Sequence, residues 1–162
     1  MRSKESRSEG YSLTELLVGC AVLGLVLAAA VPNLRSYRES QRMAAAGEQV
    51  AAACRAARAR ARSENHNVVI EYRPEENSFA VIDDENSNGT ADAGEGVNVR
   101  PLPDGLTLQA TTFPGDRLVF DGRGHATSGG NVLLAGRAGV LGRTVRVSSG
   151  TGQVKIRSGS GS

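Results

Sequence analysis

One stretch decides how this 162-residue chain is organised, namely Gly10-Tyr-Ser-Leu-Thr-Glu-Leu-Leu-Val-Gly-Cys-Ala-Val-Leu-Gly-Leu-Val-Leu-Ala-Ala-Ala-Val31, which is closed by Pro32. It follows a short charged leader, and its apolar run contains a single acid, Glu15. An apolar helix of about 20 residues is long enough to cross a bilayer core of roughly 30 Å. We therefore expect residues 11–32 to form a transmembrane helix, to which the rest of the chain is tethered.

A secretory signal peptide is the main alternative for this stretch, because it too places basic residues before an apolar core. Two details count against it. The apolar run is long, and Glu15 lies where such a core should be purely apolar.

Glu15 has two interpretations that can coexist. Ser12-Leu-Thr-Glu15 fits a capping box, in which the two side chains satisfy backbone donors at the start of a helix. An ionisable group within hydrocarbon is also costly enough to indicate a functional site.

The stretch resembles the N-terminal signal of type IV prepilins and type II secretion pseudopilins. In that family the leader is cleaved after a glycine, the next residue is N-methylated, and a glutamate occupies the fifth mature position. These features match Gly10, Tyr11 and Glu15, with Tyr11 in place of the usual phenylalanine. The resemblance implies that a prepilin peptidase and methylase removes residues 1–10, and that Glu15 pairs with the free amine of Tyr11 in a neighbouring subunit.

The resemblance also implies where the protein is located. Basic residues flank both ends of the apolar run, so the distribution of charge does not fix its orientation. By resemblance, the chain is a single-pass protein of the bacterial inner membrane with a periplasmic head, and it is incorporated into a pilus or pseudopilus.

Charge is unevenly distributed along the chain, although the formal net charge is only +2. Residues 35–62 carry seven arginines and two acids, residues 64–121 carry twelve acids and three arginines, and residues 122–162 carry six bases and no acid. This asymmetry indicates contacts with neighbouring subunits or a polyanion. Alternatively, the two basic regions simply solubilise an acidic middle.

Residues 33–63 are predicted to continue the helix as a periplasmic stem, with a kink at Pro32. Small apolar residues recur at helical spacing and predict a face that lies close against a sheet: Val50, Ala53, Cys54, Ala57 and Ala61. Arg55, Arg58 and Arg62 form another stripe, which we expect to be solvated. Cys54 is expected to be a buried apolar residue that forms no disulfide with Cys20.

Residues 64–157 are predicted to form a β-rich head, because the pattern changes to alternation between turn residues. Seven strands are expected, at Asn67–Tyr72, Ser78–Asp83, Leu106–Ala110, Arg117–Phe120, Asn131–Leu134, Arg143–Val147 and Gln153–Arg157. They favour an α+β fold with the long helix on an antiparallel sheet and a second small sheet toward the C-terminus. Residues 158–162 are expected to be a flexible tail.

The order of these segments resembles the GspH/FimT branch of minor pilins. The shared features are an Ala- and Arg-rich stem, a Val-Val-Ile hairpin, an Asp-x-Asn-x-Asn-Gly loop, Leu-Val-Phe120-x-Gly-x-Gly and a closing Gly-x-Val-x-Ile156 strand. This resemblance implies the type IV pilin fold, in which the long N-terminal helix spans the membrane with its first half and packs on a small antiparallel sheet with its second.

The segment Asp84–Glu95 fits D-x-[DN]-x-[DN]-G-x5-E, the spacing of a calcium-binding loop. The candidate ligands are Asp84, Asn86, Asn88, Thr90, Asp92 and Glu95. The alternative is a loop in which Asn and Asp side chains hydrogen-bond their own backbone. No cofactor is expected to be required, and a calcium ion is the one candidate.

Basic residues near the C-terminus suggest phosphate contacts, and the candidates are Arg143, Arg146, Lys155 and Arg157. FimT-like pilins that take up DNA carry Gly-Arg-x-Arg near the end, but this chain has Gly152-Gln-Val-Lys155 there. It also offers no aromatic platform for bases. We therefore expect a solvated basic face rather than DNA binding.

We do not expect an enzyme, because His66 and His125 are isolated and no nucleophile motif is present. His66 is expected to be a cap or loop residue. By resemblance, the chain is a structural minor pilin that primes or caps a type IV pilus, with other minor and major pilins and the inner-membrane assembly platform as partners. A GspH-like pseudopilin of a type II secretion system and a FimT-like DNA-binding pilin are the alternatives.

Overall fold

The computed structural model describes the backbone of residues 12–89, 92, 94–136 and 142–159, and the side chains of these residues except 29–36 and 159. The chain divides into two compact units, Met1–Arg38 and Glu39–Ser162. The predicted leader, residues 1–10, and Tyr11 lie outside the described residues.

Helix α1, Leu13–Glu64, is 52 residues long and begins close to the predicted position. Within the first unit its large apolar side chains are exposed, and Leu13 and Leu25 keep 76% and 73% of their surface accessible.

Across the residues that the structure describes, no helix combines the length and the apolar character that a membrane crossing needs. The predicted transmembrane span, residues 11–32, includes Tyr11 and the side chains of residues 29–32, which lie outside the described part of the chain. The transmembrane helix therefore stays a prediction. The helix includes Pro32 without interruption, and the predicted kink there also stays a prediction.

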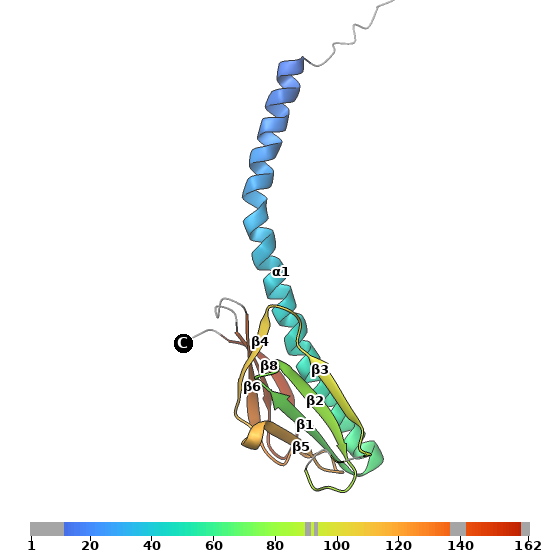
Figure 1. Ribbon diagram of the computed structural model, residues 1–162. Helices are drawn as coiled ribbons and strands as arrows, with labels where there is room; N and C mark the ends of the chain where they lie inside the picture. The colour runs from blue at the N-terminus through green and yellow to red at the C-terminus, as the bar shows by residue number, and fades with distance from the viewer. Residues whose placement is uncertain (1–11, 90–91, 93, 137–141, 160–162) are drawn as a thin grey trace, which may run out of the picture. The chain divides into compact units, whose positions relative to one another are not determined.

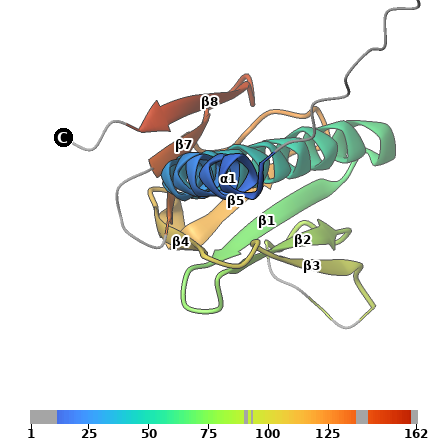
Figure 2. The same cartoon turned by 90° about the horizontal axis from the view of Figure 1, so that it is seen from above.

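The second unit packs α1 against two sheets. The predicted small-residue stripe is confirmed, because all five of its members are buried together with Met43, Ala46 and Ala51. The lack of a side chain at Gly47 lets α1 approach strands β7 and β8 closely, since a Cβ there would lie 3.3 Å from Arg143 Cδ and 3.7 Å from Ile156 Cγ2. Figure 2 shows the helix with β7 and β8 on one side and β1, β2 and β3 on the other.

The described residues of this unit form two four-stranded antiparallel sheets (Figure 1). The first has the order β3-β2-β1-β5, with β1 at Asn67–Arg73, β2 at Ser78–Asp84, β3 at Val97–Pro101 and β5 at Arg117–Phe120. The second has the order β4-β6-β7-β8, with β4 at Leu106–Thr111, β6 at Gly130–Gly136, β7 at Gly142–Val147 and β8 at Val154–Gly159. All seven predicted strands are confirmed, and β3 is an addition.

The chain passes between the two sheets three times, from β3 to β4, from β4 to β5 and from β5 to β6, and aromatic side chains pack near the second crossing. After β4 it passes through a short 3-10 turn, Pro114–Asp116, and returns to the first sheet as β5, which pairs with β1. Phe113, just before this turn, stacks on Tyr72 of β1 with ring centroids 5.6 Å apart. Residues from α1 and both sheets therefore share one core.

The predicted flexible tail, residues 158–162, needs a correction. Strand β8 continues to Gly159, and Ser158 and Gly159 pair with Arg143 and Gly142 of β7. The prediction was wrong for these two residues because backbone pairing with a neighbouring strand requires no side-chain burial. Residues 160–162 lie outside the described part of the chain.

The Phe120-x-Gly-x-Gly segment turns tightly over the end of α1. Asn65 has a left-handed φ of 55° directly after the helix, and Gly122 lies against its backbone. A Cβ at Gly122 would lie 2.9 Å from the carbonyl carbon of Asn65, a contact that no rotamer change can relieve. Gly124 has a φ of 76°, where glycine carries no steric penalty.

We expect Gly122→Ala to lower the free energy of unfolding by about 1–3 kcal/mol, because either the helix end or the turn must shift. Urea unfolding of the full-length chain in detergent measures this loss. Gly142→Ala is the matched control, since its Cβ would meet Leu134 O at an ordinary 3.5 Å. Equal stability of the two variants would contradict the close approach of Gly122 to Asn65.

Candidate functional site

The N-terminal motif is described only from Ser12 onward, so Gly10 and Tyr11 lie outside the described residues. The carbonyl of Ser12 accepts hydrogen bonds from the amides of Glu15 and Leu16, at 3.0 and 3.2 Å. The Ser12 hydroxyl lies 2.6 Å from the Thr14 hydroxyl. Among the described residues, the Ser12 hydroxyl contacts Thr14, and no hydrogen bond joins the Ser12 or Glu15 side chain to the backbone as a capping box would. The Glu15 side chain is exposed on an apolar helix.

The candidate calcium loop lies between strand β2, which is predicted from the sequence, and strand β3, which is not. The two carboxylate oxygens of Asp84 accept the amides of Asn88 and Gly89, both at 2.9 Å, and Asn86 Oδ1 also accepts the Asn88 amide at 2.9 Å. Asp84 is fully buried. The predicted hydrogen bonding of Asx side chains to their own backbone is therefore confirmed for Asp84 and Asn86.

The acids at the far end of this loop face its start. Asp92 Oδ2 accepts the side-chain amides of Asn86 and Asn88, the first at 2.7 Å. Glu95 Oε2 accepts the Asp92 amide at 2.9 Å, while Glu95 Oε1 is buried without a hydrogen-bond partner among the described residues. Thr90 lies outside the described residues. Hydrogen bonds thus link the other five candidate ligands within one loop, and Glu95 Oε1 is the buried carboxylate oxygen among them that has no partner in the described residues.

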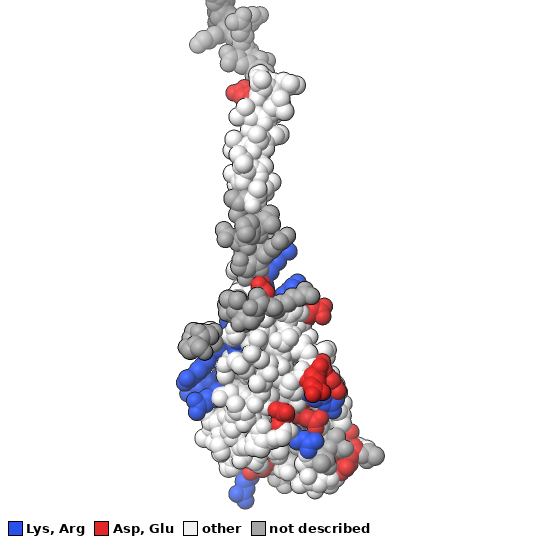
Figure 3. Space-filling view, turned by 60° about the vertical axis from the view of Figure 1, so that its left-hand side comes forward, with Lys and Arg blue, Asp and Glu red and all other residues white. Residues whose placement is uncertain are grey.

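The four basic candidates do not share one face of the second sheet. Arg146 lies opposite Lys155 in the β7–β8 pairing, Arg157 lies opposite Thr144, and all three basic side chains are exposed. Arg143 belongs to the opposite face, because it lies two residues before the buried Val145, on the same side of the strand, and packs against Gly47 of α1. On the face in Figure 3, basic side chains gather at the left of the head, and acidic side chains gather on the other side with a few basic ones.

The arginine stripe of α1 is only partly solvated. Arg55 is exposed and lies 3.5 Å from Glu48, but Arg58 donates a 3.0 Å hydrogen bond to the carbonyl of Gly124. With Arg62, these residues line a cavity of about 300 Å³ against residues 152–154. The prediction of a solvated face is thus corrected for Arg58, which holds the turn after β5 onto the helix.

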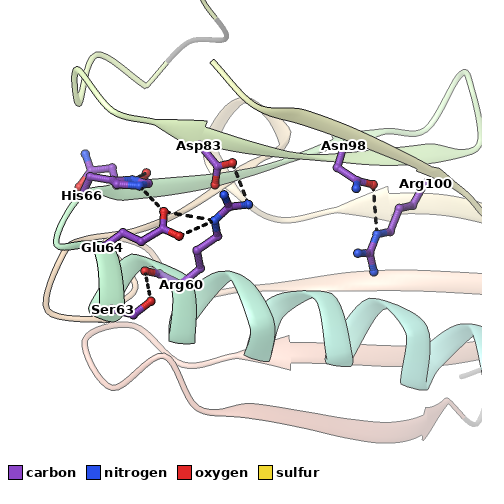
Figure 4. A network of polar contacts seen from close by, with 8 residues as sticks. Arg60, Ser63, Glu64, His66, Asp83, Asn98 and Arg100 are labelled. Carbon is purple, nitrogen blue, oxygen red and sulfur yellow. Dashed lines mark hydrogen bonds and ion pairs between the residues drawn. The ribbon is translucent and has the colours of Figure 1, made fainter. Parts of the chain in front are cut away.

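Sequence reasoning missed a polar cluster at the end of α1 (Figure 4). Arg60 lies 2.8 Å from Asp83 Oδ2 and 3.1 Å from Glu64 Oε1, and Glu64 Oε2 lies 2.7 Å from His66 Nε2. His66 Nδ1 faces the carbonyl of Asn67 at 2.8 Å. The prediction of a cap or loop residue is incomplete for His66, because its ring joins the helix end to the sheet. Two features of the sequence could have indicated this cluster. Glu64 and His66 are two residues apart, and the acid Asp83 lies near the end of a buried strand.

Burial and hydrogen bonds shift three pKa values in this cluster. Burial raises the pKa of Asp83, although Arg60 opposes the shift. The hydrogen bond to the Asn67 carbonyl, helped by Glu64, raises the pKa of His66. The hydrogen bond from His66 lowers the pKa of Glu64. Together these groups tie three segments, the end of α1 and the ends of β1 and β2, to one another.

Cys54 lies in an environment that makes its thiol unreactive. It is fully buried, its sulfur lies 3.4 Å from the Tyr72 hydroxyl, and burial raises its pKa to about 11. Burial also raises the pKa of Tyr72. Cys54 and Cys20 are both free, which confirms the two cysteine predictions.

Comparison with known proteins extends these observations. Residues 46–152 match the family described as Type II transport protein GspH. The minor pseudopilin EpsH of the Type 2 Secretion System of Vibrio cholerae has a similar structure, with a TM-score of 0.58 and 10% identity over 72% of this chain and 97% of that one. The type IV minor pilin FimU of Pseudomonas aeruginosa gives a TM-score of 0.58 and 15% identity over 75% of this chain and 92% of that one. No curated protein matches the sequence.

The two comparisons support different statements. At such low identities the structural likeness shows the fold alone, which is the pilin fold of a helix on antiparallel sheets, as predicted. The family match covers about two thirds of the chain and lies within the second unit. The chain therefore belongs to the GspH family of minor pilins and pseudopilins.

Proposed function

We propose that this protein is a minor pilin that primes or caps the assembly of a bacterial type IV pilus and acts as a structural subunit without a reaction of its own. The observation that carries the proposal is the exposed apolar surface of α1 between Leu13 and Ala28, which includes the one acid Glu15. An apolar surface of this extent on a protein needs a membrane or a partner to cover it.

The same helix suggests how the subunit is used. Before assembly, the apolar stem holds the chain in the inner membrane with the head on the periplasmic side. A prepilin peptidase then cleaves after Gly10 and methylates Tyr11. In the filament, the stem packs among the stems of other minor and major pilins delivered by the inner-membrane assembly platform. The carboxylate of Glu15 pairs with the Tyr11 amine of a neighbour, so that neither charge is left alone in an apolar bundle.

A GspH-like role in a type II secretion system is the alternative favoured by the family match. Deletion of the gene separates the two. For the pilus role, surface filaments fall in number while secretion of extracellular enzymes continues, and the subunit is detected in sheared filaments. Loss of secretion with unchanged filaments would instead assign the chain to a secretion pseudopilus. A strain complemented with the wild-type gene is the control.

We propose further that the loop Asp84–Glu95 binds one calcium ion weakly. The support is the ligand spacing of the loop, the hydrogen bonds that join Asn86 and Asn88 to Asp92, and the buried Glu95 Oε1 that lacks a partner among the described residues. Calcium prefers several carboxylate and carbonyl oxygens, and this loop has only three carboxylates at ligand positions.

Millimolar calcium is expected to raise the melting temperature of the full-length chain in detergent, because an ion that binds only the folded state stabilises it. Glu95→Gln should abolish this increase, while Glu85→Gln, an acid of the same loop outside the ligand spacing, should retain it. An unchanged melting temperature of the wild type would remove the calcium hypothesis.

The basic face of the second sheet is not expected to hold DNA. Among the described residues of β7 and β8, three basic side chains share it, those of Arg146, Lys155 and Arg157, and three charges neutralise few phosphates. Changing Arg143, Arg146, Lys155 and Arg157 together to alanine should therefore leave DNA retention unchanged in a gel-shift assay of the full-length chain. Retention by the wild type that is lost in the variant would favour the DNA-binding alternative.

A further inference from the structure

The cluster at the end of α1 contains three metal-ligating side chains that the proposed function does not use. One ligand atom each from Glu64, His66 and Asp83 lies within 4.8 Å of the other two. They come from the last residue of α1, the residue before β1, and the penultimate residue of β2. Figure 4 shows Glu64, His66 and Asp83 directed toward the same region beside Arg60.

Asp83 supplies an independent sign that a ligand belongs here. Its side chain is only 9% exposed, because the backbone of Gly96 lies against the carboxylate. Oδ2 is held by Arg60, but Oδ1 is buried and has no hydrogen-bond partner among the described residues. Leaving a buried carboxylate oxygen unpaired costs free energy unless another group completes its contacts.

The orientation of His66 suits a metal ligand. The Asn67 carbonyl can only accept, so Nδ1 must carry the proton in their 2.8 Å contact. The Glu64 carboxylate also can only accept, so without an ion Nε2 donates to Glu64 Oε2 at 2.7 Å, and an ion would displace this proton. Metal-binding histidines commonly donate their other N–H to a backbone carbonyl, as Nδ1 does here, which fixes the orientation of the ring.

We propose that Glu64, His66 and Asp83 form a binding site for one divalent transition-metal ion, with Zn²⁺ as the best-fitting ion. Zinc takes histidine nitrogen and carboxylate oxygen at about 2.0–2.2 Å, which places neighbouring donors roughly 3.3 Å apart in a tetrahedron. The donors need only small side-chain movements to reach that spacing. A water molecule completes the shell through the opening left by Glu64, which is 43% exposed.

Arg60 is the competing cation, and its contacts define what binding changes. It holds Asp83 Oδ2 at 2.8 Å and both carboxylate oxygens of Glu64, Oε1 at 3.1 Å and Oε2 at 3.2 Å. The ion would take Asp83 Oδ1, His66 Nε2 and Glu64 Oε2, and it would displace both the proton between the last two and the contact of Arg60 with Oε2. The bound ion would then fasten the C-terminal end of α1 to the first sheet.

The test uses the full-length chain in detergent, purified without a polyhistidine tag. Titration calorimetry with Zn²⁺ should show one bound equivalent, Co²⁺ should give the visible absorption of a four-coordinate ion, and the Nε2 resonance of His66 should move in ¹⁵N-histidine spectra. His66→Gln should weaken Zn²⁺ binding by more than about tenfold.

His125→Gln is the matched control, because His125 also lies beside an acid, 3.8 Å from Asp121, but has no third ligand described near it. It should bind Zn²⁺ as the wild type does. If His66→Gln fails to fold, Glu64→Gln replaces it, since this exposed side chain is not needed in the core. Absence of Zn²⁺ binding by the wild type, or equal binding by whichever of these two variants is folded, would overturn the proposal.

Discussion

Glu15→Ala is expected to keep the protein out of filaments while its leader is still removed. Cleavage depends on Gly10 and the residues around it, whereas assembly places Glu15 among apolar stems where only a neighbour's amine can balance its charge. The variant should accumulate in membranes as a mature protein and be absent from the sheared filament fraction. Immunoblotting of both fractions, with mass spectrometry of the membrane form, measures this outcome.

Glu15→Gln separates the two interpretations of this residue. Glutamine can serve in a capping box almost as well as glutamate, but it cannot form the ion pair. If the ion pair is the function, the glutamine variant should be excluded as fully as the alanine variant. Glu39→Ala, an exposed acid further along α1, is the control and should assemble normally. Normal filament incorporation of Glu15→Ala would contradict the proposed role.

Phe120→Ala is expected to lower the free energy of unfolding by about 3–5 kcal/mol, the usual cost of truncating a buried phenylalanine. The ring is fully buried in the core shared by α1 and the two sheets. Phe120 pairs with Val68 in the first sheet, and a Cβ at Gly152 would lie 3.0 Å from its Cε1. The cavity would therefore open where the turn before β8 meets β5.

Urea unfolding of the full-length chain in detergent measures this loss. Val99→Ala is the control, because Val99 is 50% exposed on strand β3 and should cost less than about 0.5 kcal/mol. A loss below about 1 kcal/mol for Phe120→Ala would mean that the sheets do not share this core.

Much of the head could be predicted from sequence because its signals are local. The helical spacing of small residues from Val50 to Ala61 marked the buried face of α1, and alternating Val, Ile and Leu marked seven strands. Strand β3 was missed because Val97 and Val99 follow an acidic loop and remain exposed on an edge, where backbone pairing with β2 replaces burial. The alternation of Val97-Asn-Val-Arg100 is at the lower limit of length for a strand signal and ends at Pro101.

The candidate site depended more on tertiary structure. Spacing alone identified the loop from Asp84 to Glu95, since its residues are close in sequence. The cluster of Arg60, Glu64, His66 and Asp83 joins residues from a helix, a connection and a strand, which no local pattern reveals. Strand alternation could have separated Arg143 from Arg146, because consecutive odd and even positions face opposite sides of a sheet.

Mass spectrometry of the mature N-terminus is the decisive test of the proposed pilin role, because assembly into a filament depends on how residues 10 and 11 are processed. The protein is purified from the membrane of its native host, and its N-terminal peptide is sequenced. The mature chain is expected to begin at N-methylated Tyr11. A chain that retains residues 1–10, or one cleaved after Ala30 as a secretory signal would be, would contradict the proposed role.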